Sequence, residues 1–365
     1  MSKPRRRKQK KQVKAELKLR QFAATELSDQ LAALPCAADL PRFMVDTVAG
    51  AYAPADAELM IKGFGAATTR PVTLRANTLK ATAEDIAAAL DAAGIAHNPV
   101  AWYPDAFILP DAQVSDLWDL DIYRDGKIYL QSLSSMMPPL VLGAQACEDI
   151  LDMCAAPGGK TTQIAALTQG QAHLTACEMS IPRAEKLEAN LHRQGAKNVP
   201  VMRIDARELD EFFRFDRILL DAPCTGTGTV VSGNEKSLRG LTEQLLSRCA
   251  RSQRALLDRA MGALKPGGTL VYSTCSILPQ ENEDALQEAL DKHMDCELIP
   301  LDGTPSEARR AQEAGEEPRI ESNALTEAIA AGQVSAIANG LPGTLTIPPS
   351  RDFEGFYIAL IRKRS

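Results

Sequence analysis

Several features that would point to other protein classes are missing from this 365-residue sequence. No apolar run approaches the roughly 18 residues of a membrane-spanning helix, and no apolar segment follows the basic N-terminus as in a secretory signal. We therefore expect a soluble, cytoplasmic protein with no membrane partner. The eight cysteines include no CxxC pair and no Cys/His cluster at zinc spacing, which excludes the usual structural zinc motifs and leaves no metal site to expect. In an intracellular protein they should also be reduced, which argues against a disulfide framework.

The charge of the chain is distributed unevenly. Residues 1–20 contain ten Lys or Arg and one Glu, a net charge of +9, whereas the other 345 residues carry 31 basic and 46 acidic side chains, a net charge of −15. A basic arm on an acidic body is typical of proteins that bind nucleic acid, but a solvated tail with no specific partner fits the composition equally well. We treat residues 1–20 as a disordered basic tail.

The length allows two domains, and the pattern of the chain changes near residue 140. Residues 21–140 contain helical spacing followed by a small α+β region, whereas from Glu148 onward strands and helices alternate, which predicts a parallel sheet covered on both faces. We divide the chain into domains at 21–140 and 141–365, with a weakly patterned insertion at about 303–345. The strands expected in the second domain are Ile150–Met153, Leu174–Glu178, Val199–Ile204, Arg217–Asp221, Thr269–Thr274, Glu297–Pro300 and Phe356–Ile361.

Two cysteines follow directly after such strands. Cys224 lies in Asp221-Ala-Pro-Cys-Thr-Gly-Thr-Gly228, and Cys275 lies in Tyr272-Ser-Thr-Cys-Ser276. Because open α/β sheets bind ligands beyond the carboxyl ends of their strands, both thiols should meet at one edge of the sheet. Two thiols at a ligand site indicate covalent chemistry.

A third motif, Leu151-Asp-Met-Cys-Ala-Ala-Pro-Gly-Gly-Lys-Thr161, connects a strand to a helix and is suited to hold a cofactor. Glu178 ends the second strand, where doubly wound folds bind ribose hydroxyls, and Asp205 follows the third. Glu178 could instead cap a helix and Asp205 could occupy a solvated turn, but the series of strand-end positions favours a site. No G-x-G-x-x-G or P-loop motif is present. A nucleoside cofactor without a pyrophosphate fits better, and S-adenosylmethionine is the candidate.

These motifs together resemble those of the NOL/NOP/Sun family of S-adenosylmethionine-dependent RNA cytosine-5 methyltransferases. The resemblance is carried by 154–160, 221–228, Ser273–Ser276 followed by Glu281-Asn-Glu283, and the closing Glu354-Gly-Phe-Tyr-Ile-Ala359. Upstream, 70–80 and 129–136 are similar to parts of that family's RNA-binding domain. The sequence departs from the family at Thr225, where Ser is usual, and at Glu354, where Asp is common. The resemblance implies a Rossmann-like class I methyltransferase domain, with a seven-stranded mixed sheet, behind an N-terminal α+β RNA-binding domain.

The resemblance also implies roles for individual residues. Cys275 would be the nucleophile, Cys224 would assist product release, and Asp221 would hydrogen-bond or protonate the pyrimidine edge. The expected cofactor-binding residues are Cys154, Ala155, Ala156, Pro157, Gly158, Gly159, Lys160, Glu178, Arg183, Asp205 and Asp221. Arg75, Lys80, Arg124 and Lys127 could contact RNA phosphates, although surface charges are more often simply solvated.

The expected reaction follows from the chemistry of cytosine. Carbon 5 is too weak a nucleophile to accept a methyl group unaided, so a thiolate must first add to carbon 6. The partners are then S-adenosylmethionine and an RNA, either rRNA or tRNA, and a monomer is the default state. Three alternatives remain: a DNA cytosine-5 methyltransferase, a catalytically silent RNA-binding or assembly factor, and a redox switch between the two cysteines. The second thiol and the RNA-like upstream domain disfavour the first, the intact thiols disfavour the second, and the absence of CxxC disfavours the third.

Overall fold

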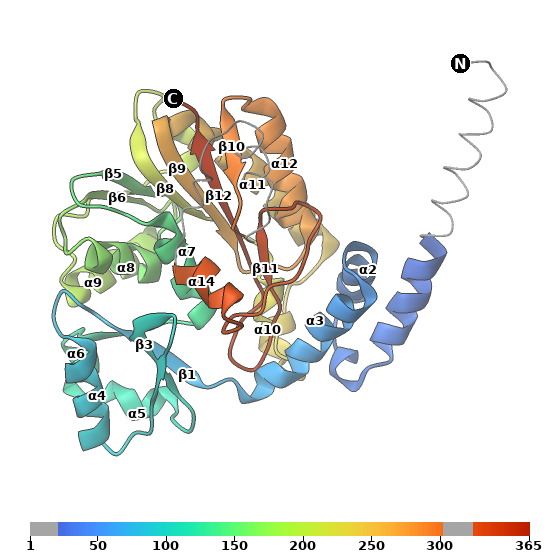
Figure 1. Cartoon of the computed structure of the whole chain (residues 1–365), viewed down its shortest axis with the longest axis horizontal. Coiled ribbons are helices and arrows are strands. Elements are labelled where there is room, and N and C mark those ends of the chain that lie inside the picture. The colour runs from blue at the N-terminus through green and yellow to red at the C-terminus, as the bar shows by residue number, and fades with distance from the viewer. Residues whose placement is uncertain (1–20, 302–323) are drawn as a thin grey trace.

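The computed structural model describes residues 21–301 and 324–365, which form two β-sheets with flanking helices (Figure 1). The expectations for residues 1–20 and for 303–323 of the insertion lie outside the described residues. Within the described ranges, no helix is long and apolar enough to cross a membrane.

Helices at the N-terminal end of the described chain pack against the second half of the molecule. Residues 21–32 are helical and are followed by α2 (Arg42–Ala51) and α3 (Pro54–Ala66). The hydroxyl of Tyr52 donates to the carbonyl of Ile277 at 2.8 Å, and the backbone N–H of Ser232 bonds to the carbonyl of Phe64 at 3.0 Å. These helices therefore support the chain segments that follow the two cysteine motifs.

Along the sequence, the smaller sheet follows the N-terminal helices and precedes the larger sheet. Its strand order is β2-β3-β1-β4, and every pairing is antiparallel. Thr82 caps α4 through a capping box, in which its hydroxyl accepts from Asp85 N–H at 3.2 Å and Asp85 accepts from Thr82 N–H at 3.0 Å. The elements are β1 (Val72–Ala76), α4 (Ala83–Ala92), β2 (Asn98–Val100), β3 (Tyr103–Leu109), α5 (Val114–Trp118), α6 (Asp121–Arg124) and β4 (Ile128–Leu130).

The larger sheet has the order β10-β12-β9-β8-β5-β6-β7, with β11 pairing with β12. Neighbours from β9 to β7 are parallel, whereas β12 and β10 are antiparallel to their partners. The strands are β5 (Asp149–Asp152), β6 (His173–Cys177), β7 (Val201–Met202), β8 (Phe215–Asp221), β9 (Leu264–Thr274), β10 (Cys296–Ile299), β11 (Leu345–Ile347) and β12 (Phe356–Lys363). The mixed sheet expected from the sequence is confirmed, with β11 as an addition to the seven expected strands.

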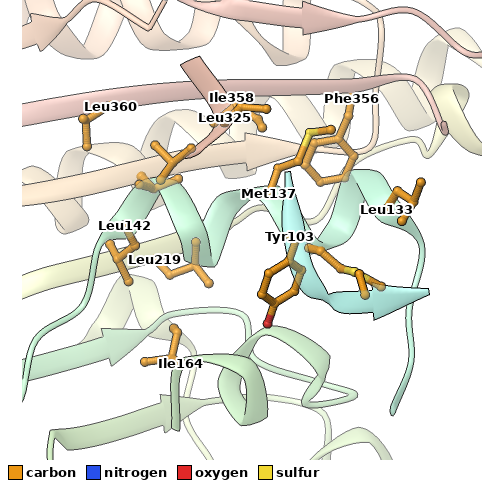
Figure 2. Close-up of a cluster of buried hydrophobic side chains, with 14 of the residues drawn as sticks. Tyr103, Leu133, Met137, Leu142, Ile164, Leu219, Leu325, Phe356, Ile358 and Leu360 are labelled. Atoms are coloured by element: carbon orange, nitrogen blue, oxygen red, sulfur yellow. The ribbon is translucent and has the colours of Figure 1, made fainter. Parts of the chain in front are cut away.

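Helices cover both faces of this sheet, because consecutive strand residues point in opposite directions. Ile150 packs in the cluster of α7, α8 and α9, whereas Leu151 packs in that of α11 and α12. Figure 2 shows Met137 and Leu142 of α7 in one cluster with the sheet residues Leu219 and Ile358 and with Ile164 of α8. The helices are α7 (Leu133–Leu142), α8 (Gly159–Leu167), α9 (Ile181–Gln194), α10 (Glu235–Leu238), α11 (Glu243–Ala263), α12 (Glu283–Lys292) and α14 (Ala324–Ala330).

The domain division stays a prediction. α7 packs against β8, β9 and β12 although it begins at Leu133, so a division at residue 140 falls inside this helix. The segment predicted as an insertion also contributes to the sheet, since Leu345 begins β11 and Ile337 bridges to Thr346.

Candidate active site

The loop at 153–158, which the sequence predicts to hold a cofactor and which is called the cofactor loop below, lies close to its neighbours, so no side chain fits at two of the glycines around its end. β5 ends at Asp152, and the chain continues through the loop into α8. Gly158 has φ 105°, in the left-handed region, and a Cβ there would lie 2.9 Å from Cδ1 of Leu187. A Cβ on Gly159 would lie 3.1 Å from Cε1 of Tyr129. The two glycines thus allow the loop to pass between α9 and β4.

A pocket of about 70 Å³ beside this loop contains the acidic residues expected at the next two strand ends. Glu178 is 4% exposed, and its Oε2 lies 3.3 Å from Nη1 of Arg183, whose Nη2 donates to the carbonyl of Ala156 at 2.9 Å. Asp205 accepts from the backbone N–H of Arg207 at 3.0 Å and pairs with its guanidinium, which lowers the pKa of the Asp205 carboxyl. Both carboxylates also make local turn contacts, since Glu178 accepts from the N–H of Ser180 at 2.9 Å. Each carboxylate therefore stabilises its own turn, and both line the same pocket.

The two predicted thiols meet. Cys224 follows β8, Cys275 follows β9, and their Sγ atoms lie 3.3 Å apart without forming a disulfide. Parallel pairing of Asp221 with Ser273 brings the two strand ends level, and each cysteine follows within three residues of its paired position. The sheet register therefore determines the contact between the cysteines.

A lysine and an aspartate form an ion pair next to the thiols. Lys160 Nζ donates to Oδ2 of Asp221 at 2.7 Å and to Oγ of Ser135 at 2.8 Å, and Ser273 Oγ donates to Oδ1 of Asp221 at 2.8 Å. Burial opposes the charge of Lys160, but the Asp221 carboxylate outweighs it and raises the pKa of the lysine. The lysine is a cation held at a defined position.

Asp152 is a buried carboxyl with spare hydrogen-bonding capacity. It is 1% exposed, and its Oδ2 accepts from Oγ1 of Thr161 at 2.7 Å, whereas its Oδ1 has no hydrogen-bond partner of normal geometry among the described residues. The backbone N–H of Cys154 makes a weak contact with the carboxyl. Burial raises the pKa of Asp152 to about 6, although the Thr161 hydrogen bond opposes this change. The sequence places Asp152 at a strand end but gives no sign of this free oxygen.

A second pocket of about 310 Å³ extends from Cys275 to the cofactor loop. Cys275, Lys160 and Asp221 line it together with Asp152 and the loop, and Cys154 lines both this pocket and the one containing Glu178. The remaining lining residues are Tyr129, Leu130, Gln131, Ser132, Ser135, Ala155, Ala156, Pro157, Gly159, Thr229, Glu354 and Phe356. The two pockets are therefore neighbours at Cys154.

Two backbone segments cross in close contact at Gly228, four residues after Cys224. A Cβ on Gly228 would lie 1.9 Å from the carbonyl oxygen of Gly355, and the N–H of Gly355 donates to the carbonyl of Gly228 at 2.8 Å. Gly228 N–H in turn donates to the carbonyl of Cys275 at 2.9 Å. The crossing fastens the Cys224 loop to the Cys275 loop and to the start of β12.

The structure thus places the predicted site residues at one sheet edge, where all but Gly158 and Cys224 line one of the two pockets; Cys224 contacts Cys275, and Gly158 lies in the cofactor loop. Other residues of the site were given no individual role from the sequence. Ser132 donates to Oε2 of Glu354 at 2.7 Å, and Glu281 accepts hydrogen bonds beside both thiols. Glu281 and Glu354 belong to recognised motifs, but only the fold reveals their partners.

Arg75 and Lys80 have partners within the chain, which argues against the suggested phosphate contacts. Arg75 is fully buried, and it donates to Oε1 of Gln131 at 2.8 Å, to the carbonyl of Gly159 at 2.9 Å and to Oγ1 of Thr162 at 2.8 Å. Lys80 donates to the carbonyl oxygens of Asp125 and Arg193, each at 2.7 Å. These side chains join the smaller sheet to the cofactor loop and to α9.

Comparison with known proteins identifies the family of this chain. The family model described as 16S rRNA methyltransferase RsmB/F matches residues 139–362, and one described as an RsmF/B-like ferredoxin-like domain matches residues 40–115. The chain belongs to the RsmB/F methyltransferase family. This membership confirms the resemblance to the NOL/NOP/Sun family and the expected Rossmann-like methyltransferase fold.

Individual relatives share much of this RsmB/F-family chain. Ribosomal RNA small subunit methyltransferase F of Vibrio parahaemolyticus is 35% identical over 316 residues, which cover 84% of this chain and 60% of the relative. The 28S rRNA (cytosine-C(5))-methyltransferase of Mus musculus is 39% identical over 237 residues, covering 63% of this chain and 30% of that protein. A crystal structure of a methyltransferase homolog from Pyrococcus horikoshii is 30% identical, with a TM-score of 0.70, and covers 93% of this chain and 99% of that one. The chain therefore spans about 60% or less of the two curated relatives.

Proposed function

We propose that this protein transfers a methyl group from S-adenosylmethionine to carbon 5 of a cytosine in RNA, through a covalent bond between Cys275 and carbon 6. The observation that carries the proposal is the 3.3 Å contact of Cys224 and Cys275, with Cys275 lining a pocket that adjoins the cofactor loop at Cys154. A substrate ring and a methyl donor have to meet in this way.

The residues present fit S-adenosylmethionine. Glu178, 4% exposed at the end of β6, is placed to accept hydrogen bonds from ribose hydroxyls, and Asp205 lines the same pocket. The unpartnered Oδ1 of Asp152 offers an acceptor to a primary ammonium group such as that of an amino acid. The loop 154–160, Arg183 and Asp221 complete the proposed cofactor-binding set. The bound cofactor would supply a methyl group activated by a sulfonium.

The residues of the chain account for the remaining steps. The Cys275 thiolate forms a bond to carbon 6, which places the electron pair of the 5,6 double bond at carbon 5 for attack on the methyl group. Asp221 and the cation of Lys160 line the pocket where the edge of the pyrimidine would lie, and they can hydrogen-bond it and stabilise the developing charge. Afterwards the proton on carbon 5 passes to a base, the 5,6 double bond re-forms, and the carbon–sulfur bond to Cys275 breaks. Cys224 assists this release.

We propose an rRNA as the substrate, because the relatives covering most of this chain are named as rRNA methyltransferases. We further propose that the protein acts as a monomer in the cytoplasm. The described residues of one chain are enough to line both pockets. The reaction also needs both cysteines reduced, and the cytoplasm maintains thiols in that state.

The proposal is tested by methyl transfer from radiolabelled S-adenosylmethionine to rRNA, followed by bisulfite sequencing of rRNA from cells with and without the gene. A cytosine that is protected only when the gene is present, and is unprotected with Cys275→Ala, is the expected result. The alternative of a silent assembly factor predicts the opposite: no labelled RNA, and full complementation of the cells by a protein lacking both thiols.

A further inference from the structure

A fully buried carboxylate lies behind the two thiols. Glu281 is 0% exposed and accepts from the backbone N–H of Thr225 at 2.7 Å and from its hydroxyl at 2.5 Å. It also accepts from Oγ of Ser276 at 2.5 Å and, more weakly, from Nε2 of Gln253 at 3.4 Å. Thr225 and Ser276 are the residues immediately after Cys224 and Cys275. One carboxylate therefore contacts both cysteine loops.

In all four contacts the partner donates the hydrogen bond and Glu281 accepts it. The position therefore requires a side chain that only accepts hydrogen bonds. A carboxylate has only acceptor oxygens, whereas an amide would present an NH₂ group to some of those donors. Burial raises the pKa of Glu281, while the hydrogen bonds from Ser276 and Thr225 oppose this change by stabilising its charged form. The backbone of Glu281 is fixed as well, because the hydroxyl of Tyr272 donates to its carbonyl at 2.5 Å.

We propose that Glu281 is a positioning residue for both cysteines, which holds the Cys224 loop against the Cys275 loop and places a negative charge on the Cys224 side. This inference rests on the proposed function and refines it, because it names the residue that holds the two thiols together. It also accounts for the departure at Thr225, since threonine retains the hydroxyl that Glu281 binds.

The charges around the thiols are arranged asymmetrically. The hydrogen bond with Cys275, burial and the charges of Cys275 and Glu281 raise the pKa of Cys224 well above its usual value. The Lys160 cation interacts electrostatically with Cys275. The other titratable groups around Glu281 are Tyr272 and Cys249, both on the neutral side of their titrations at pH 7 because burial raises the pKa of each. Burial and these neighbours therefore favour the protonated form of Cys224, whose thiol can donate a hydrogen bond to Cys275.

Adduct formation would then change the state of Cys224. Once the thiolate of Cys275 forms its bond to carbon 6, its negative charge is consumed. The charge and the hydrogen bond that hold the proton on Cys224 are then lost, so Cys224 can release that proton to solvent and later accept the one from carbon 5. Glu281 keeps Cys224 within reach during this exchange.

Thiol alkylation of the full chain tests the inference without RNA. Iodoacetamide modification of Cys224 and Cys275 is followed by peptide mass spectrometry between pH 6 and 10, with the exposed Cys147 as internal reference. Glu281→Gln removes the negative charge beside Cys224, so the pKa of Cys224 should fall. Each pKa unit of this decrease raises the thiolate fraction of Cys224, and with it the alkylation rate, about tenfold. Thr225→Val lacks the hydroxyl that Glu281 binds and should also raise the alkylation rate of Cys224. Thr225→Ser keeps the hydroxyl and should retain the wild-type pH dependence of alkylation.

Release of RNA supplies the second measurement. Glu281→Gln should leave Cys224 out of position for release of the product. The variant should therefore accumulate a protein–RNA adduct and turn over at least about tenfold more slowly. An unchanged alkylation profile together with wild-type turnover would overturn the role of Glu281. Wild-type protein that alkylates as described but transfers no methyl group would instead contradict only the proposed function. Thermal unfolding of each variant separates these outcomes from a loss of the fold, and Thr225→Val keeps the test available if Glu281→Gln does not fold.

Discussion

Replacing Glu283 by glutamine should stabilise the protein in a pH-dependent way. Glu283 is 4% exposed at the start of α12, and its carboxylate oxygens have no hydrogen-bond partner of normal geometry among the described residues. Burial raises its pKa from 4.5 to about 7, and only weak contacts from the backbone N–H groups of Glu283 and Gly340 oppose this change. Asp284 and the buried phenols of Tyr52 and Tyr357 are its titratable neighbours.

The direction of the pH effect follows from proton binding. Between pH 4.5 and 7 the folded protein holds a proton on Glu283 that the unfolded chain has lost, so stability falls as the pH rises through this range. The difference between the two pKa values corresponds to about 3 kcal/mol, at about 1.4 kcal/mol per pKa unit. Glutamine cannot ionise, so the variant avoids this cost at pH 8 and gains little at pH 5.

Thermal unfolding at pH 5 and pH 8 measures the effect. We expect Glu283→Gln to raise the midpoint by on the order of 5 °C more at pH 8 than at pH 5. Glu185→Gln, at an exposed position of α9, serves as control and should show no such dependence. Equal changes in midpoint at the two pH values would refute the assignment of a buried, unpaired carboxylate.

Three further substitutions probe the site. Gly228→Ala places a Cβ 1.9 Å from the carbonyl oxygen of Gly355, so it should separate the loops and abolish methyl transfer, and an active variant with an unchanged thermal midpoint would contradict the crossing. Arg75→Met removes the hydrogen bonds from β1 to Gln131, Gly159 and Thr162, and should lower the free energy of unfolding by about 3 kcal/mol or more, measured by urea denaturation. Lys160→Met leaves Asp221 without its cation and should slow single-turnover methyl transfer on the order of a hundredfold, while a near-wild-type rate would show that the ion pair is dispensable.

The sequence predicts the site better than it predicts the surrounding elements. Strand-end positions for Glu178, Cys224 and Cys275 follow from short apolar runs and the geometry of parallel sheets, and the structure places all three where expected. The helix α7 is not apparent, because Pro138 and Pro139 interrupt its pattern. Pro139 has no N–H to donate to the carbonyl of Ser135, one helical turn earlier. Gln131 Nε2 donates to that carbonyl instead, at 3.0 Å.

Contacts between distant parts of the chain are beyond a reading of local pattern. Ser132 and Glu354 are 222 residues apart and form a hydrogen bond, while Arg75 leaves its strand to bond with Gly159 in the cofactor loop. β11 is hidden for a related reason: three residues are too few for a period, and their pairing with β12 is what makes them a strand. The charge of a lysine or arginine likewise does not reveal whether it meets solvent or a buried carbonyl.

The central claim is that the two adjacent thiols have unequal jobs, and trapping the covalent intermediate tests it most directly. Cys224→Ala and Cys275→Ala proteins are incubated with S-adenosylmethionine and the rRNA substrate and then separated on a denaturing gel. We predict a stable protein–RNA adduct with Cys224→Ala and none with Cys275→Ala. An adduct that forms with Cys275→Ala instead would show that Cys224 is the nucleophile and contradict the assignment.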